Sequence, residues 1–144
     1  MQTRLPLQIA ANVALVDIGT ARAVKGLDTE SLVALTESGE FRWVWDVGTG
    51  RNRRELRFWR LELVDASVTN NLLMPAVIDT ILPTTRDRFR SGELQALFTI
   101  SAQLILQHYK AGTLDGTQTS TTLYITRASL AQFLFKRLIS TNNY

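Results

Sequence analysis

Apolar residues in the C-terminal half of the chain recur at the spacing of two short helices. Leu94, Leu97 and Phe98 form an i, i+3, i+4 stripe, which predicts a first helix. The stretch "TIS" ends it, and Ser101 is suited to cap a second helix. That helix should end at Gly112, where a left-handed cap is favoured. Two short helices joined by a tight turn predict a helix-turn-helix.

A hairpin and a third helix are expected to follow. The turn-forming "GTQTST" precedes the β-prone "TLYI", which predicts two short strands. The stretch "TRASLAQFLFKRLI" predicts a closing helix, because Leu130, Phe133, Leu134 and Leu138 would share one face.

The N-terminal half shows the same order when the sequence is shifted by 73 residues, so that Gly39 falls on Gly112. Asp28 is suited to cap the second helix of this half. A hairpin follows, with "EFRWVWDV" and "RRELRFWR" as strands and "GTGRN" as the turn. In its first strand, Phe41, Trp43, Trp45 and Val47 alternate onto one expected face. "LELVDASV" would be a short closing helix.

Residues 89–134 resemble the excisionase-like winged-helix domains related to the MerR type. The match consists of spaced apolar, glycine and basic positions: Ile100, Ser101, Ile105, Lys110, Gly112, Leu114, Ile125, Arg127, Leu130, Phe133 and Leu134. The N-terminal half resembles the family less closely. The resemblance implies DNA binding, with the second helix of each unit in the major groove and the hairpin, or wing, at the adjacent backbone or minor groove.

We therefore expect an α+β fold of two tandem winged helix-turn-helix units. The predicted divisions are an N-terminal unit over 1–68, a connector over 69–88 and a C-terminal unit over 89–144. Within the connector, "LMPAVIDTIL" is an ordered segment whose type stays open.

Composition narrows the function classes. The 144 residues are 45% hydrophobic and 20% charged, which is typical of a folded protein, and no apolar run is long enough to span a membrane. The chain has no Cys and one His, so neither a Cys-ligated nor a His-rich metal site is expected. No phosphate-binding loop and no cluster of acidic metal ligands is present, and we expect no enzyme activity and no cofactor. A cytoplasmic location fits these features.

The strongest local charge signal is "RNRRELRFWR", next to the expected hairpin tip. Long cationic side chains at such a tip can reach phosphates or a narrow minor groove. The alternative is a solvated hairpin whose charge is offset by nearby carboxylates. The candidates for DNA contact here are Arg51, Arg53, Arg54 and Arg57.

Further candidates lie in the C-terminal half, where residues 73–144 carry seven Lys or Arg and four Asp or Glu. Gln103, Gln107 and Lys110 are expected on the solvent side of the second helix; Gln can bond adenine and Lys can reach guanine or phosphate. An exposed polar helix face is also the ordinary surface of a soluble protein. Two further groups complete the candidate set: Arg86, Arg88 and Arg90, which an extended strand would project on one side, and Ser101 and Arg127.

The second helix of the N-terminal half carries Asp28, Glu30 and Glu37, which would repel phosphate. Three alternatives are open: this helix faces away from DNA, the N-terminal unit contacts DNA only through its hairpin, or the helix binds protein. The leading hypothesis is a double-stranded DNA-binding protein, either a transcriptional regulator or a recombination accessory factor, with homo-oligomerisation open. The alternative is a protein-interaction or phage-type structural adaptor that uses the same fold without DNA.

Overall fold

The computed structural model describes residues 13–49, 54–69 and 71–139 as an α+β fold, the predicted class. The N-terminal unit comprises β1 (Leu15–Asp17), α1 (Ile18–Lys25), α2 (Thr29–Glu37), β2 (Val44–Asp46), β3 (Leu56–Trp59) and α3 (Arg60–Val64). α4 (Ala66–Thr69) lies at the boundary between the N-terminal unit and the connector, and α5 (Met74–Ile81) lies within the connector. The C-terminal unit comprises β4 (Arg88–Arg90), α6 (Ser91–Phe98), α7 (Ala102–Ala111), β5 (Gly116–Gln118), β6 (Leu123–Thr126) and α8 (Arg127–Arg137).

The two units share one element order and one sheet topology. Each contains a three-stranded antiparallel sheet, in the order β1-β3-β2 in one unit and β4-β6-β5 in the other. The helix pair of the C-terminal unit begins 73 residues after its counterpart, as the sequence pattern predicted, and the preceding strand, which was not predicted in the N-terminal unit, follows the same offset. Asp28 and Ser101 both cap a second helix with their side-chain oxygens, and Gly39 and Gly112 both have positive φ. The N-terminal unit differs mainly in its closing helix, which is much shorter than α8.

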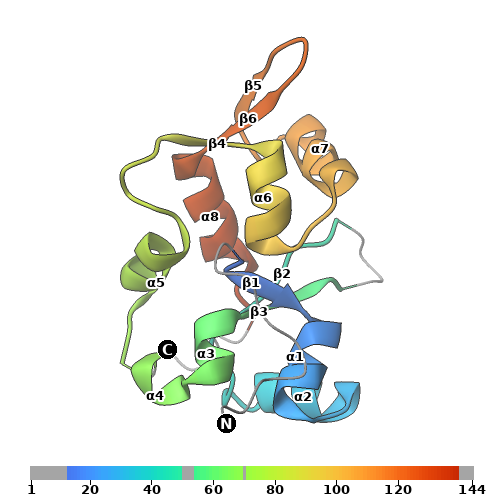
Figure 1. Cartoon of the computed structure of the whole chain (residues 1–144), viewed down its shortest axis with the longest axis vertical. Helices are drawn as coiled ribbons and strands as arrows, with labels where there is room; N and C mark the ends of the chain where they lie inside the picture. Colours follow the sequence, from blue (N-terminus) through green and yellow to red (C-terminus); the bar gives the residue numbers. More distant parts are fainter. Residues whose placement is uncertain (1–12, 50–53, 70, 140–144) are drawn as a thin grey trace, which may run out of the picture.

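The sheet of the N-terminal unit is buried on both faces and lies between the helices of the two units (Figure 1). Val16, Val44 and Phe58 face α1 and α2 within one hydrophobic cluster. Leu15 and Trp59 face the other way and belong to a second cluster that continues into the C-terminal unit. This second cluster therefore joins the two units.

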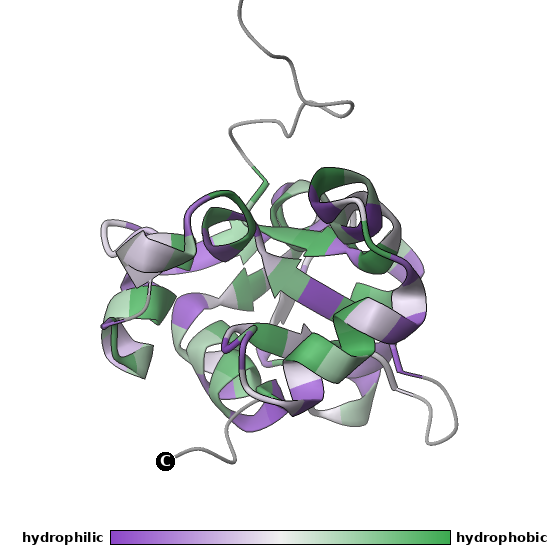
Figure 2. Ribbon diagram, turned by 90° about the horizontal axis from the view of Figure 1, so that it is seen from below, coloured by the Kyte–Doolittle hydropathy of each residue, from purple (hydrophilic) through white to green (hydrophobic). Residues whose placement is uncertain are grey.

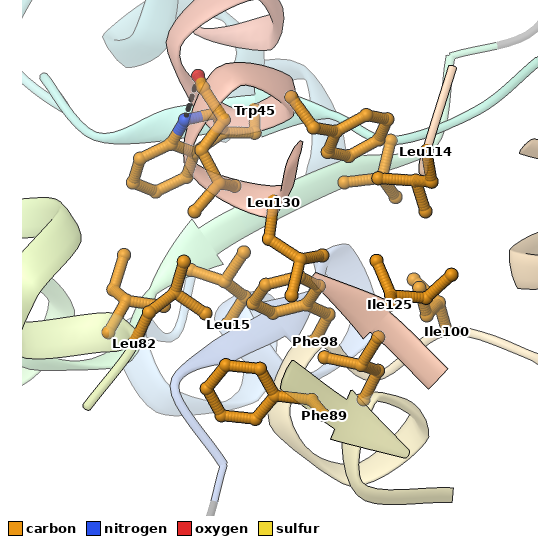
Figure 3. Close-up of a cluster of buried hydrophobic side chains, with 14 of the residues drawn as sticks. Leu15, Trp45, Leu82, Phe89, Phe98, Ile100, Leu114, Ile125 and Leu130 are labelled. Carbon is orange, nitrogen blue, oxygen red and sulfur yellow. Dashed lines mark hydrogen bonds between the residues drawn. The ribbon is translucent and has the colours of Figure 1, made fainter. Parts of the chain in front are cut away.

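Figure 3 shows part of this shared cluster, which includes Leu15 and Trp45 of the N-terminal unit as well as Phe89 and Phe98 of the C-terminal unit. Leu82, at the end of α5, packs into the same cluster. Figure 2 shows the same distribution, with apolar residues concentrated in the central strands.

The sheet of the C-terminal unit is covered on one face. Phe89 and Ile125 point into the core, whereas Arg88 and Arg90 are exposed on the opposite face. The counterpart of Arg88 is the buried Leu15, because the two strands correspond at the 73-residue offset. In the N-terminal unit, the sheet face that carries Leu15 is covered by the C-terminal unit. The equivalent face of the C-terminal sheet carries Arg88 and is exposed.

One predicted alternation is wrong. Trp43, Trp45 and Val47 share a cluster, but Phe41 lies in the other one, where its ring meets that of Phe58 edge-on at 6.0 Å. The physical reason is that the strand begins only at Val44, so strand alternation does not extend back to Phe41.

Candidate nucleic-acid interface

The helix α7 has well-defined ends. Ser101 Oγ accepts a hydrogen bond from the Leu104 amide at 3.0 Å, which satisfies one of the free N–H groups of the first turn. Gly112 ends the helix with φ of 82°, a conformation that glycine adopts without strain. Because the Ser101 hydroxyl is engaged in the cap, its predicted contact with DNA would compete with the helix end.

The outward face of α7 carries three of the predicted residues. Gln103, Gln107 and Lys110 are all exposed, and their spacing of four and three residues places them on one side of the helix. The opposite side, with Leu104 and Ile105, is buried in the shared cluster. The helix therefore presents two amides and one ammonium group in a row to solvent.

The hairpin of the N-terminal unit adjoins α7. The imidazole Nε2 of His108 lies 2.8 Å from the Val47 carbonyl oxygen, which fixes the base of the hairpin against the inner side of α7. Arg137 of α8 holds the same base by donating to the Gly48 carbonyl at 2.7 Å. Beyond this base, Arg54 is exposed. The predicted contacts Arg51 and Arg53 lie outside the described residues.

His108 is a buried packing residue, with 1% of its surface exposed. Its ring meets Phe133 edge-on at 4.9 Å, and its Nδ1 has no hydrogen-bond partner among the described residues. Burial lowers the pKa of His108, while the hydrogen bond to Val47 opposes that shift. The ring is therefore held neutral at physiological pH, and Nε2 carries the proton that it donates.

Arg57 does not lie on a DNA-facing surface, contrary to the prediction. It is 9% exposed, and its guanidinium donates to the Phe98 and Thr99 carbonyls at the end of α6. Burial lowers the pKa of Arg57, and nearby carboxylates, with Glu55 the strongest, partly offset that shift. The side chain joins the two units and has no free face for phosphate.

Arg127 is also engaged inside the molecule. Its guanidinium pairs with Asp79 at 2.7 Å and donates to the Leu82 and Pro83 carbonyls at 2.9 and 3.2 Å. These contacts tie α8 to the connector. The predicted DNA contact of Arg127 would require them to break.

The three alternate arginines before α6 do not all have the same environment. Arg88 and Arg90 are exposed on either side of buried Phe89, as predicted, whereas Arg86 folds back onto Glu93 at 2.6 Å. That hydrogen bond lowers the pKa of Glu93. The Arg88 guanidinium lies over the Tyr124 ring at 4.3 Å. Phe89, between these two arginines, belongs to the shared cluster, so Arg88 and Arg90 lie on the face of the sheet that points away from that core.

The corresponding face of α2 is acidic. Glu30, Ala34 and Glu37 occupy the positions that Gln103, Gln107 and Lys110 occupy in α7, and all three are exposed. Asp28 accepts a hydrogen bond from the Ser31 amide at 2.8 Å, and this bond lowers the pKa of the Asp28 carboxyl group. The negative face of α2 disfavours contact with phosphates.

Two absences concern the described part of the chain. Within residues 13–49, 54–69 and 71–139, no group of three or more His, Asp or Glu side chains is arranged to hold a metal ion. No helix in these ranges is long and apolar enough to cross a membrane.

Neither a protein-family model, nor a curated protein, nor a solved structure shows significant similarity to this chain. What the protein does must therefore be inferred from its own residues.

Proposed function

We propose that the chain consists of two tandem winged helix-turn-helix units, similar to the excisionase-like and MerR-type domains, and binds double-stranded DNA. In this proposal α7 enters the major groove, and the hairpin of the N-terminal unit contacts the backbone beside it. The observation that carries the proposal is the row of Gln103, Gln107 and Lys110 on the free face of a capped second helix.

The chemistry of this row suits DNA. A glutamine amide can donate to and accept from the adenine edge in the major groove, and Lys110 can reach guanine or a phosphate. Arg54 is exposed on the adjoining hairpin, where a cation would neutralise a phosphate without reading sequence. Such a division between a reading helix and a backbone contact fits a transcriptional regulator or a recombination accessory factor.

One observation favours a second candidate function. The acidic face of α2, with Glu30 and Glu37 exposed, suits a basic protein partner better than a nucleic acid. A protein-interaction adaptor without DNA binding would use this face, and it would leave the polar row of α7 as ordinary surface.

The test is to select a preferred duplex from a random pool and to measure its affinity by fluorescence anisotropy. Replacing Gln103 by Ala should weaken binding to the preferred duplex by roughly 1–3 kcal/mol and relax the sequence preference at one base pair. Gln132→Ala is the matched control, because Gln132 is an exposed glutamine on a different helix, α8. If no duplex binds, or if both variants behave alike, α7 is not a reading helix and the adaptor is favoured.

A further inference from the structure

The turn between α6 and α7 contains a strained residue. Thr99 has φ of 54° and ψ of 51°, and it is the one non-glycine residue of positive φ in the described ranges. A branched side chain disfavours this left-handed conformation. The N-terminal unit uses Gly26, with φ of 67°, at the corresponding place 73 residues earlier. The C-terminal turn therefore needs support that its counterpart does not need.

That support comes from the N-terminal unit. Arg57 Nε donates to the Phe98 and Thr99 carbonyls at 3.1 and 3.0 Å, and its Nη2 donates to the Thr99 carbonyl at 2.7 Å. The Ala14 amide donates to the Leu97 carbonyl at 2.9 Å. These are carbonyls at a helix C-terminus, where intrahelical partners are lacking and a cation is favoured. The N-terminal unit thus caps a helix of the C-terminal unit.

Further contacts fix both partners of this cap. The Thr99 hydroxyl donates to the Leu15 carbonyl at 2.7 Å, so the strained residue is held through its side chain as well. Arg57 also donates through Nη1 to the Leu56 carbonyl at 2.9 Å. The guanidinium is planar and nearly enclosed, so its fork can be satisfied in few orientations.

From this geometry we infer that Arg57 is a positioning residue for DNA recognition, which sets the angle of α7 through the Thr99 turn. The inference rests on the proposed function of α7. Because α7 begins three residues after Thr99, a change in that turn would reorient the whole outward row, including Gln103 and Lys110. Base-edge hydrogen bonds tolerate little change in distance or angle. The N-terminal unit then contributes to recognition by holding the reading helix, and its acidic α2 need not touch DNA.

The experiment compares two variants that differ only at Arg57. Thr99→Gly is the background, because glycine adopts the left-handed turn without strain, so the turn can still form when Arg57 is removed. Its carbonyl still accepts from Arg57, whereas the hydroxyl bond to Leu15 is absent from all the variants compared, so Arg57 alone remains to orient the turn. The Thr99→Gly/Arg57→Met variant removes the guanidinium and keeps a long apolar side chain. Thr99→Gly/Arg60→Met is the matched control: Arg60 adjoins the same strand and donates to the Val13 carbonyl at 2.8 Å, but it makes none of the contacts that hold the turn.

The first readout is the ratio of affinities for the preferred and a scrambled duplex, measured where each variant is folded. Removal of the Arg57 guanidinium should reduce this ratio about ten-fold, the effect of breaking one good bidentate pair with a base edge. The slope of log affinity against log salt should stay the same, because Arg57 touches no phosphate. An unchanged ratio, or an equal reduction in the Arg60 variant, would overturn the inference.

The second readout does not involve DNA. Amide hydrogen exchange should become faster in α7 than in the background variant when Arg57 is removed, while α2 keeps its protection. Unchanged exchange in α7 would show that Arg57 does not hold the helix, whatever the binding data. If the native protein binds no duplex, the proposed function fails and recognition by α7 fails with it, while the exchange data still decide whether Arg57 fixes α7.

Discussion

Replacing Trp45 by Phe tests whether the two units form one cooperative structure. Trp45 belongs to the N-terminal unit, is fully buried, and donates its indole N–H to the Leu134 carbonyl of α8 at 2.8 Å (Figure 3). Phenylalanine cannot make this bond, which leaves a buried carbonyl without that partner at a cost of about 1–3 kcal/mol. The smaller ring also removes about two carbons from the core, which costs roughly 1.5 kcal/mol before any cavity term.

Together these two effects predict that Trp45→Phe lowers the free energy of unfolding by about 2.5–4.5 kcal/mol. Urea denaturation followed by circular dichroism measures this change. Because the shared cluster includes residues of both units, the variant and the native protein should each unfold in one transition with the same slope. Two separate transitions, or a decrease below about 1 kcal/mol, would refute the idea that the units share a core.

Three further predictions concern the core, the first turn and pH. Replacing Ile105, Leu130 or Phe133 by Ala should each destabilise the protein by about 2–5 kcal/mol in urea denaturation, because all three are buried; no shift in midpoint for any of them would contradict that packing. Gly26→Ala should cost about 1–2 kcal/mol in thermal unfolding, since φ is 67° and the added Cβ meets no atom, so strain alone acts. The lowered pKa of His108 means that the unfolded chain takes up its proton first as pH falls, so stability should drop from pH 7 towards pH 5 by at most about 1.4 kcal/mol per pH unit. His108→Gln should show a shallower decline over that range, and an identical decline would exclude a contribution from this histidine.

Local signals in the sequence predicted much of each unit. Asp28 and Ser101 correctly indicated where the second helices begin, because capping depends on residues that are close in sequence. Gly39 and Gly112 indicated where these helices end for the same reason. The type of α5 stayed open, although its proline near the first turn is a usable helix signal.

The role of Arg57 could not be predicted, because it depends on packing between segments about 40 residues apart. Because Arg57 belongs to a cluster of arginines near a turn, the sequence suggested that it is exposed to solvent. It is buried because the C-terminal unit covers this face of β3. One signal was available: Arg57 and Trp59 share a strand face, and a face that carries tryptophan is often covered. The exposure of Gln103, Gln107 and Lys110 was predicted correctly, because helical spacing fixes the outward side of α7 once the inner side is known. Their contact with DNA stays a prediction.

The salt dependence of affinity for a random duplex tests the central claim, that the chain binds DNA, most directly. Replacing Arg51, Arg53 and Arg54 together by Ala should reduce the slope of log affinity against log salt by about 0.9 for each phosphate that these arginines neutralise, and by about 2.7 if each neutralises one. Gln103→Ala should leave that slope nearly unchanged, because a hydrogen bond to a base edge releases no counterion. If the native protein shows no salt-sensitive affinity for duplex DNA, the claim is wrong.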